Sequence, residues 1–223
     1  MRHFRTKTDC RVVVLSGMGR AFSAGQDLEE RRDVGTKPID LGAELAANWH
    51  PLIKLVHSTD RPVVAAVNGL ASGAAANLVL ACDIVLAARS ASFTQPFVRI
   101  GIMPDCGGIY TLPRLVGLAR ARAMAMLGFP MNAERAEQIG LIWRMVEDHE
   151  LEPETRGVVG RLLQAAPLAL AATKRALRES PGLDLEAVLA LEAAQQQRLG
   201  RSRDYVEGVR AFFDRRSPEF CGQ

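Results

Sequence analysis

The sequence predicts an α/β fold over residues 1–147, followed by a helical region over residues 148–223. Two observations carry this prediction. Short β-branched runs alternate with helical segments rich in small residues up to about residue 147, and beyond that point the strand signal stops. The units of strand, turn and helix also recur along the chain, which favours a stacked spiral of β-β-α units.

Two turns rich in glycine and alanine each follow a predicted buried strand. The first strand, Val12 to Ser16, leads into a turn that ends near Gln26, and the second, Val63 to Val67, leads into a turn that ends near Asn77. Glycine and alanine leave the backbone uncovered, so peptide N–H groups in such turns can approach a ligand closely. Two turns of this kind can together form an oxyanion hole.

The remaining elements follow from spacing and from proline and glycine signals. Between the two turns we expect a mobile polar loop over Glu29 to Asp40 and a helix over Leu41 to Val56 with a kink at Pro51. The other expected elements are helices over Ala74 to Ala81 and Ala133 to Ile139, strands over Asp83 to Ala87, Ala91 to Thr94 and Ile142 to Val146, and C-terminal helices over Gly157 to Ala166, Pro167 to Glu179, Asp184 to Leu199 and Asp204 to Arg215. These C-terminal helices are typical of a lid or an oligomerisation region.

Composition favours small-molecule chemistry. A net charge of +3 over 223 residues gives little support to nucleic-acid or membrane binding, and no apolar stretch is long enough for a membrane span. The four cysteines and four histidines lack metal-ligand spacing, so we expect no metal site and reduced thiols. The N-terminus lacks an apolar signal region, and we therefore expect a cytoplasmic protein.

Several segments, in this order and spacing, resemble the enoyl-CoA hydratase/isomerase (crotonase) superfamily from Cys10 to Gln223. They are Gly19–Leu28, Arg61–Gly69, Ala81–Ile84, Gly101–Gly108, Ala136–Leu141 and the tail around Glu207 to Phe220. Within the family, Gly73–Asn77 together with Pro104–Gly108 most resembles the ring 1,2-epoxyphenylacetyl-CoA isomerases. The resemblance implies a crotonase-like spiral, an acyl-CoA thioester as substrate, no metal or redox cofactor, and a homotrimer or a dimer of trimers (a hexamer).

The resemblance also implies roles for particular residues. The oxyanion hole would use the peptide N–H groups of Gln26 and Ala74 to stabilise negative charge on the thioester oxygen of an enolate. The neighbouring residues expected to contact the substrate or its coenzyme A portion are Ser23, Ala24, Gly25, Asp27, Gly73, Phe97 and Tyr110.

The catalytic side chains depart from the hydratase pattern. A typical hydratase has glutamates at the positions held here by Asn77 and Phe97, and neither of these can exchange a proton. Asp105 is the remaining candidate, because in the family's isomerases an aspartate at this position faces the acyl group. We expect Asp105 to lie in an apolar pocket that raises its pKa and to move a proton there. We expect Asn77 to orient the substrate or a water molecule.

The same residues also allow other interpretations. Without the resemblance, Asp105 is an ordinary turn or N-cap residue, Asn77 a helix residue that satisfies a loop carbonyl, and Asp27 a turn cap. Gly17-Met18-Gly19 has Phe22 in place of the third glycine of a dinucleotide fingerprint. Ala21–Gly25 resembles a nucleophile elbow, but no convincing His/Asp pair follows it.

The function expected from the sequence is an enolate-mediated double-bond or ring isomerase in phenylacetate or fatty acyl-CoA catabolism. The first alternative is an enoyl-CoA hydratase working through Asp105 and an ordered water molecule. The second is a catalytically silent CoA-binding member. It stays open because family members carry a longer N-terminal segment, so the first strands of the spiral are expected to be missing and a sheet edge to be bare.

Overall fold

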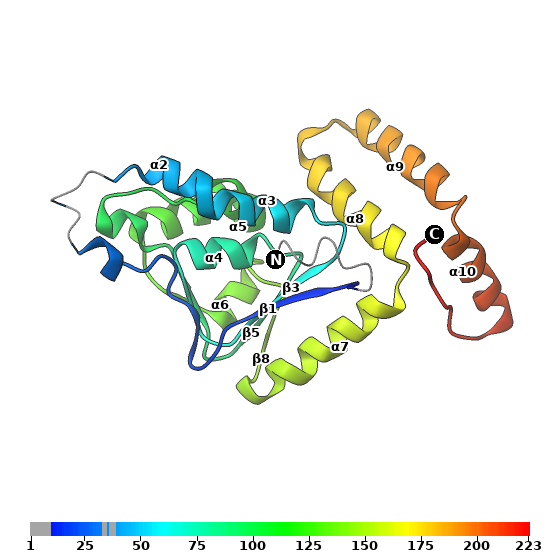
Figure 1. Ribbon diagram of the computed structural model, residues 1–223, viewed down its shortest axis with the longest axis horizontal. Helices are drawn as coiled ribbons and strands as arrows, with labels where there is room; N and C mark the ends of the chain where they lie inside the picture. Colours follow the sequence, from blue (N-terminus) through cyan, green and yellow to red (C-terminus); the bar gives the residue numbers. More distant parts are fainter. Residues whose placement is uncertain (1–9, 33–34, 36–38) are drawn as a thin grey trace. The chain divides into compact units, whose positions relative to one another are not determined.

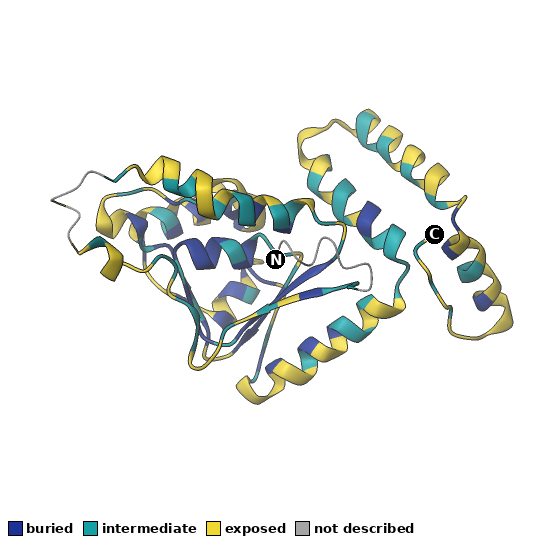
Figure 2. Cartoon of the chain, in the orientation of Figure 1, coloured by how far each residue is buried: buried dark blue, intermediate teal, exposed yellow. Residues whose placement is uncertain are grey.

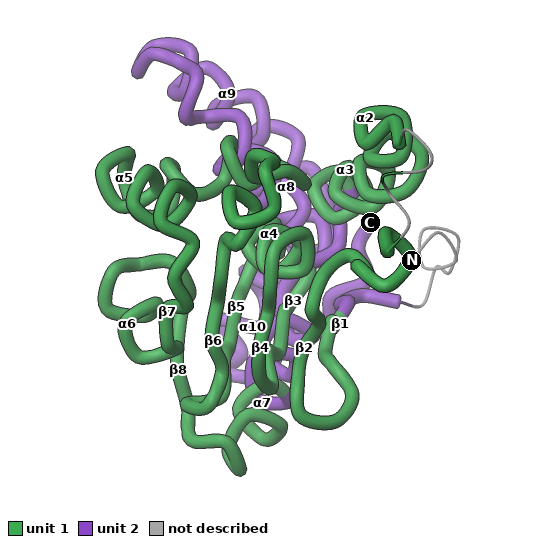
Figure 3. Tube along the Cα trace, turned by 90° about the vertical axis from the view of Figure 1, so that its left-hand side faces the viewer, with its two compact units in different colours: residues 1–6, 14–58, 63–155 green, residues 7–13, 59–62, 156–223 purple. Residues whose placement is uncertain are grey.

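The structure, a computed structural model, describes residues 10–32, 35 and 39–223, and it divides the chain into two compact units (Figure 3). Unit 1 contains Val14–Ser58 and Val63–Thr155, and unit 2 contains residues 10–13, Thr59–Pro62 and Arg156–Gln223. The predicted boundary at residues 147 and 148 stays a prediction. The nine N-terminal residues, on which the expectation of missing strands partly rests, lie outside the described residues.

Two four-stranded sheets form the framework of the described residues. The first has the order β1 (Val13–Ser16), β3 (Val63–Val67), β5 (Ile84–Ala88) and β8 (Arg144–Val146). The second has the order β2 (Ala21–Ser23), β4 (Leu70–Ser72), β6 (Ser92–Thr94) and β7 (Met131–Asn132). The strands β3, β5 and β8 pair in parallel, as do β2, β4 and β6, whereas β7 runs antiparallel to β6.

All five residues of β3 are buried, which explains why its sequence is an unbroken apolar run rather than an alternating one. After β3 the chain passes through β4 and enters α4 (Ala74–Leu80), six of whose seven residues are buried, so that the helix is almost entirely dark blue in Figure 2. The small alanine side chains allow this close packing. Strand, turn and helix thus follow one another here as the sequence predicts.

The segment before β3 is less regular than a single kinked helix. Helix α2 (Leu41–Glu44) passes into one turn of π-helix, η2 (Leu45–Trp49), and then into α3 (His50–Ser58). Pro51 lacks the N–H that an α-helix would use at that point, and the wider turn just before it accommodates this loss. Helices α3 and α4 lie at the same end of the strands in both views of the chain (Figures 1 and 3).

The other elements of unit 1 are short, except for α5 (Gly108–Leu127), which turns sharply at Gly117. They are the 3-10 turns η1 (Glu29–Arg31), η3 (Pro96–Ile100) and η4 (Asp148–Glu150), and helix α6 (Ala133–Gln138). Helix α7 (Leu151–Gln164) continues into unit 2, which also contains α8 (Pro167–Glu179), η5 (Ser180–Gly182), α9 (Leu185–Leu199) and α10 (Arg203–Asp214). In the described part of the chain, no helix is both long and apolar enough to span a bilayer.

Candidate active site

Pairing of β2 with β4 brings the two glycine-rich turns together. In this pair Ala21 lies opposite Leu70 and Ser23 opposite Ala71, so the chain leaves both strands at the same place. The side chain of Asn68 fastens the first turn, because its Oδ1 accepts from Gly17 N at 3.1 Å and its Nδ2 donates to the Gly19 carbonyl at 2.8 Å. Segments some 50 residues apart in sequence therefore form one surface.

Two glycines with positive φ make the close approach possible. Gly25 has φ +89°, and a Cβ atom there would lie 2.7 Å from the Ser72 carbonyl oxygen and 3.5 Å from Ala74 N. Gly73, with φ +55°, donates its N–H to the Thr94 carbonyl at 3.0 Å and turns the chain into α4. An alanine side chain at either position would be strained, so the glycines are required by the backbone itself.

The peptide N–H groups of Gln26 and Ala74 follow these two glycines. Neither donates to an acceptor within the described residues, as expected for Ala74 at the first turn of a helix. The Gln26 side chain is held at both ends, since its Oε1 accepts from Trp49 Nε1 and its Nε2 donates to Glu30 Oε2, each at 3.2 Å. These contacts fix the peptide that presents the Gln26 N–H.

A cavity of about 950 Å³ in unit 1 unites most of the predicted site residues. It is largely apolar, with aromatic and aliphatic side chains such as Trp49, Phe97 and Ile102. The predicted site residues that line it are Ala24, Gln26, Gly73, Ala74, Phe97 and Asp105. An apolar cavity of this size with a few converging polar groups is the usual form of a small-molecule site.

Asp105 enters this cavity from the loop before α5, and its backbone is held firmly. Its carbonyl oxygen accepts from Asn77 Nδ2 at 2.9 Å and from Gly108 N at 2.8 Å. The oxygen of the same Asn77 amide accepts from Gln95 Nε2 at 2.8 Å. A Cβ atom at Gly108 would lie 2.5 Å from Asn77 Nδ2, so a glycine is needed for this approach.

The environment of the Asp105 carboxyl group is poorly solvated. Its Oδ1 atom is hidden from solvent and has no hydrogen-bond partner among the described residues. Burial raises the pKa of Asp105 above its ordinary value, although the Cys106 thiol and the charge of His50 partly oppose the rise. Burial and the neighbouring Asp105 in turn raise the pKa of the Cys106 thiol, which keeps the thiol protonated. Cys106 also has a left-handed backbone, with φ +49°.

Five of the predicted residues do not line the cavity. Ser23 Oγ accepts from Gly25 N at 3.2 Å, and Asp27 Oδ1 accepts from Glu29 N at 3.0 Å, so both side chains stabilise the first turn. Gly25 lies close to the Ser72 carbonyl, and Asn77 donates to the main-chain carbonyl of Asp105. The ring of Tyr110 faces away, because it packs edge-on against His57 and carries the Arg114 guanidinium at 3.6 Å from its centroid.

Some cavity residues are not evident from the sequence. His50 and Trp49 line the cavity, at the junction of η2 and α3, and Arg31 and Glu44 contribute an ion pair to the same wall. Helical spacing offers a weak signal for His50, which stands three residues before the buried Ile53 and so borders the buried face. No helical or strand spacing links Arg31 with Glu44, because they are 13 residues apart in the sequence.

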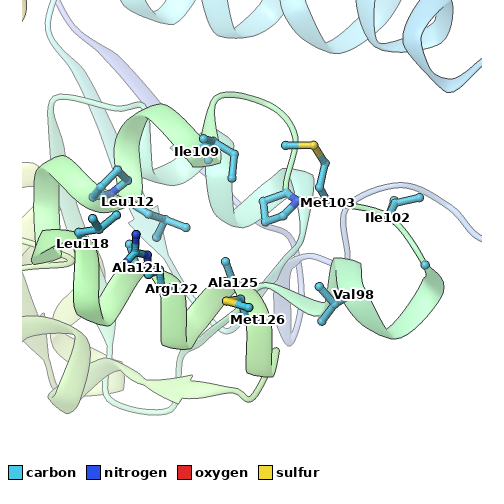
Figure 4. A pocket seen from close by; sticks show the side chains of 14 residues that line it. Val98, Ile102, Met103, Ile109, Leu112, Leu118, Ala121, Arg122, Ala125 and Met126 are labelled. Atoms are coloured by element: carbon cyan, nitrogen blue, oxygen red, sulfur yellow. The ribbon is translucent and has the colours of Figure 1, made fainter.

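A second, smaller cavity of about 410 Å³ adjoins the first and is lined largely by residues of α5 (Figure 4). Ile102, Met103, Pro104 and Ile109 line both cavities and so form a shared wall. The rest of its lining is mainly apolar, with Leu112, Leu118 and Met126 labelled in Figure 4 together with Arg122. In the residues that the structure describes, no group of three or more metal-ligating side chains is present.

The fold is that of the crotonase class, as the sequence predicts. The profile of the enoyl-CoA hydratase/isomerase family matches residues 1–223, and the chain belongs to this family. It is 45% identical to a probable enoyl-CoA hydratase from Rhodobacter capsulatus, over 98% of this chain and 84% of that protein. It is 42% identical to the 1,2-epoxyphenylacetyl-CoA isomerase of Escherichia coli, over 96% of this chain and 82% of the relative.

Solved structures agree with this assignment. An enoyl-CoA hydratase from Bacillus anthracis matches with a TM-score of 0.93 at 31% identity, covering 100% of this chain and 85% of the other. The protein is therefore an enzyme of the crotonase family that acts on acyl-CoA.

Proposed function

We propose that this enzyme isomerises an acyl-CoA thioester through an enolate, with Asp105 as the group that moves the proton. The observation that carries the proposal is the joint lining of one cavity by Gln26, Ala74 and Asp105. The two turns supply main-chain N–H donors, and the loop before α5 supplies one carboxyl group of raised pKa.

The reaction follows from this geometry. The carboxylate of Asp105 removes a proton from the carbon chain of the bound thioester, and negative charge then develops on the thioester oxygen. The N–H groups of Gln26 and Ala74 stabilise that charge, an interaction for which one donor is worth about 2.7–4 kcal/mol in other enzymes. Asp105 then delivers a proton to a different carbon. A raised pKa suits a group that must both accept and donate a proton.

The side chains at positions 77 and 97 favour isomerisation over hydration. Phe97 lines the cavity and has no group that could position water. Asn77 is fully buried and uses both ends of its amide on Gln95 and Asp105. Its contacts support a positioning role behind Asp105 rather than direct contact with substrate. A typical hydratase uses two glutamates, whereas here Asp105 is the acid–base side chain that lines the cavity with the two main-chain donors.

Hydration is the second candidate function. The Rhodobacter capsulatus relative, at 45% identity, is named as a probable enoyl-CoA hydratase, whereas the Escherichia coli relative is named as an isomerase. The name of the latter supports a ring-epoxide thioester, and hence aromatic catabolism, as the favoured substrate class here. In neither reaction does the proposed chemistry need a metal or a redox cofactor, and the expected homotrimer stays a prediction.

The test is an assay of the wild type and Asp105→Asn on crotonyl-CoA, on a 3-enoyl-CoA and on the epoxide of phenylacetyl-CoA. Binding of each thioester is measured in parallel. We expect the wild type to turn over the 3-enoyl-CoA or the epoxide of phenylacetyl-CoA. In Asp105→Asn this turnover should be lost while binding of the thioester persists. Rapid loss of the enoyl absorbance of crotonyl-CoA would instead identify a hydratase. Binding without turnover by the wild type would identify a silent CoA-binding member.

A further inference from the structure

The cavity contains few groups that can carry a proton. Among the residues that the structure describes, its ionisable lining consists of Arg31 from η1, Glu44 from α2, His50 from α3, and Asp105 and Cys106 from the loop before α5. Arg31 and Glu44 are paired with each other. The Cys106 thiol stays protonated because burial and Asp105 raise its pKa. This leaves His50, whose imidazole has two ring nitrogens that can accept and donate protons.

The position of His50 is set by its local structure. It is the first residue of α3, and its N–H donates to the carbonyl of Leu45, the first residue of the π-helical turn. The preceding Trp49 packs against the cluster of Ile53, Ala74 and Cys106, and its indole bonds to Gln26. The imidazole is exposed, and it is near enough to Asp105 for its charge to lower that carboxyl group's pKa.

One oxygen of the Asp105 carboxyl group is cut off from solvent. Oδ1 is closed to solvent and has no hydrogen-bond partner within the described residues. A bound acyl group in the same cavity would exclude further water from the carboxyl group. A proton taken by Asp105 would then return to the substrate unless another titratable group carries it outward. His50 lines the cavity and is also exposed, so it can exchange protons with both the cavity and solvent.

We infer that His50 relays protons between Asp105 and solvent during turnover. This inference rests on the proposed function. Asp105 takes a proton from the substrate carbon, and the imidazole of His50 accepts that proton from the carboxylic acid at one ring nitrogen and releases a proton from its ring to water. The reverse sequence delivers a solvent proton to the other carbon of the enolate. No proton is gained or lost overall, and no oxidant or reductant is involved.

The test is isomerisation of a 3-enoyl-CoA in D₂O, with deuterium in the product measured by mass spectrometry at low conversion. The wild type is expected to yield a product that contains solvent deuterium. In His50→Gln the deuterium content per turnover falls several-fold, because Asp105 then returns the proton it removed. In His50→Ala, added imidazole restores the deuterium content, a result that a purely structural role of His50 would not produce.

His149→Gln is the matched control, since His149 is an exposed histidine in η4 that does not line the cavity. It should give the wild-type deuterium content. A wild-type product without deuterium, or an unchanged content in His50→Gln, would overturn the relay. If the wild type fails to isomerise any thioester, or if Asp105→Asn keeps full turnover, the proposed function fails instead. The two failures are therefore distinguishable.

Discussion

The side-chain amide of Asn77 donates a hydrogen bond of 2.9 Å to the main-chain oxygen of Asp105. The two residues are 28 positions apart, and Asn77 belongs to the same helix whose first N–H group is one of the proposed enolate donors. The bond thereby links the proposed proton carrier with the proposed charge-stabilising turn. Substitutions at either end should affect both stability and turnover.

For Asn77→Ala we expect a loss of stability and of turnover together. The variant removes the bond to Asp105 and leaves the Gln95 amide without its partner in the core, and a lost buried partner costs about 1–3 kcal/mol. Urea unfolding measures the first effect and kcat the second. Normal kcat in a measurably destabilised protein would show that Asn77 does not position Asp105.

For Asp105→Asn we expect opposite changes in stability and activity. Burial raises the pKa of Asp105 in the folded protein, so ionisation of this group at neutral pH lowers the stability of the fold. Below its unfolded pKa the group is protonated in both the folded and the unfolded state, and this cost disappears. The neutral amide removes this cost. Because the group is partly solvated, the melting temperature at pH 7 should rise by only about 1–2 °C. The gain should vanish as the pH falls through the raised pKa toward the ordinary value. Equal melting temperatures at pH 7 would argue against the burial effect.

The activity of the wild type should depend on pH through the same group. Since Asp105 must be ionised to accept the first proton, kcat/KM should fall about tenfold for each pH unit below its folded pKa. Because burial raises that pKa, the decline should begin above the ordinary aspartate value of about 3.9. A pH–rate profile at constant ionic strength measures it. A decline that begins only at the ordinary value would contradict the assignment.

For Gly25→Ala we expect turnover to fall by about 10²–10³-fold, as when one enolate donor is lost. The new Cβ would meet the Ser72 carbonyl at 2.7 Å and push the two turns apart. Gly19→Ala is the matched control, because Gly19 also has a positive φ, +74°, but open space around it. Both variants bear left-handed strain of about 1–2 kcal/mol. If both lose activity equally, strain and not turn separation is responsible.

For Trp49→Phe we expect kcat to fall by about 2- to 10-fold, the equivalent of one hydrogen bond of 0.5–1.5 kcal/mol. The variant keeps an aromatic ring against Ile53 and Cys106 but loses the indole donor to Gln26. Steady-state kinetics with an isomerisable thioester separates kcat from KM. A change in KM alone would mean that Trp49 contacts substrate and does not fix the Gln26 peptide.

Strand β3 and helix α4 were predicted closely from the sequence. Strand β3 is an uninterrupted apolar run, and α4 is rich in small residues. Helix α8 was likewise predicted over Pro167 to Glu179, as the structure has it. Helix α5 was not predicted, since Pro113 and the non-helical Gly117 obscure its periodicity. Strands β2 and β4 have three residues each, too few to show alternation within segments interpreted as turns.

The predicted site shows a similar division. Gln26, Ala74, Phe97 and Asp105 were predicted from their motifs, and the structure brings them to one cavity. The contacts of His50 and of the Arg31–Glu44 pair arise from the packing of α2 and α3, which periodicity alone does not give. Tyr110 was expected near the substrate because it follows Asp105 closely. The first turn of α5 directs its ring instead toward His57 and Arg114.

The two glycines at the turns have an evolutionary consequence. Gly25 and Gly73 set the direction of main-chain N–H groups, which every amino acid except proline possesses, whereas the proton-carrying group at position 105 is a side chain. Mutation can therefore exchange the acid–base residue at position 105 without removing the main-chain donors that stabilise the enolate. In a chain of this design, side chains can change the fate of the proton while the backbone continues to hold the same intermediate.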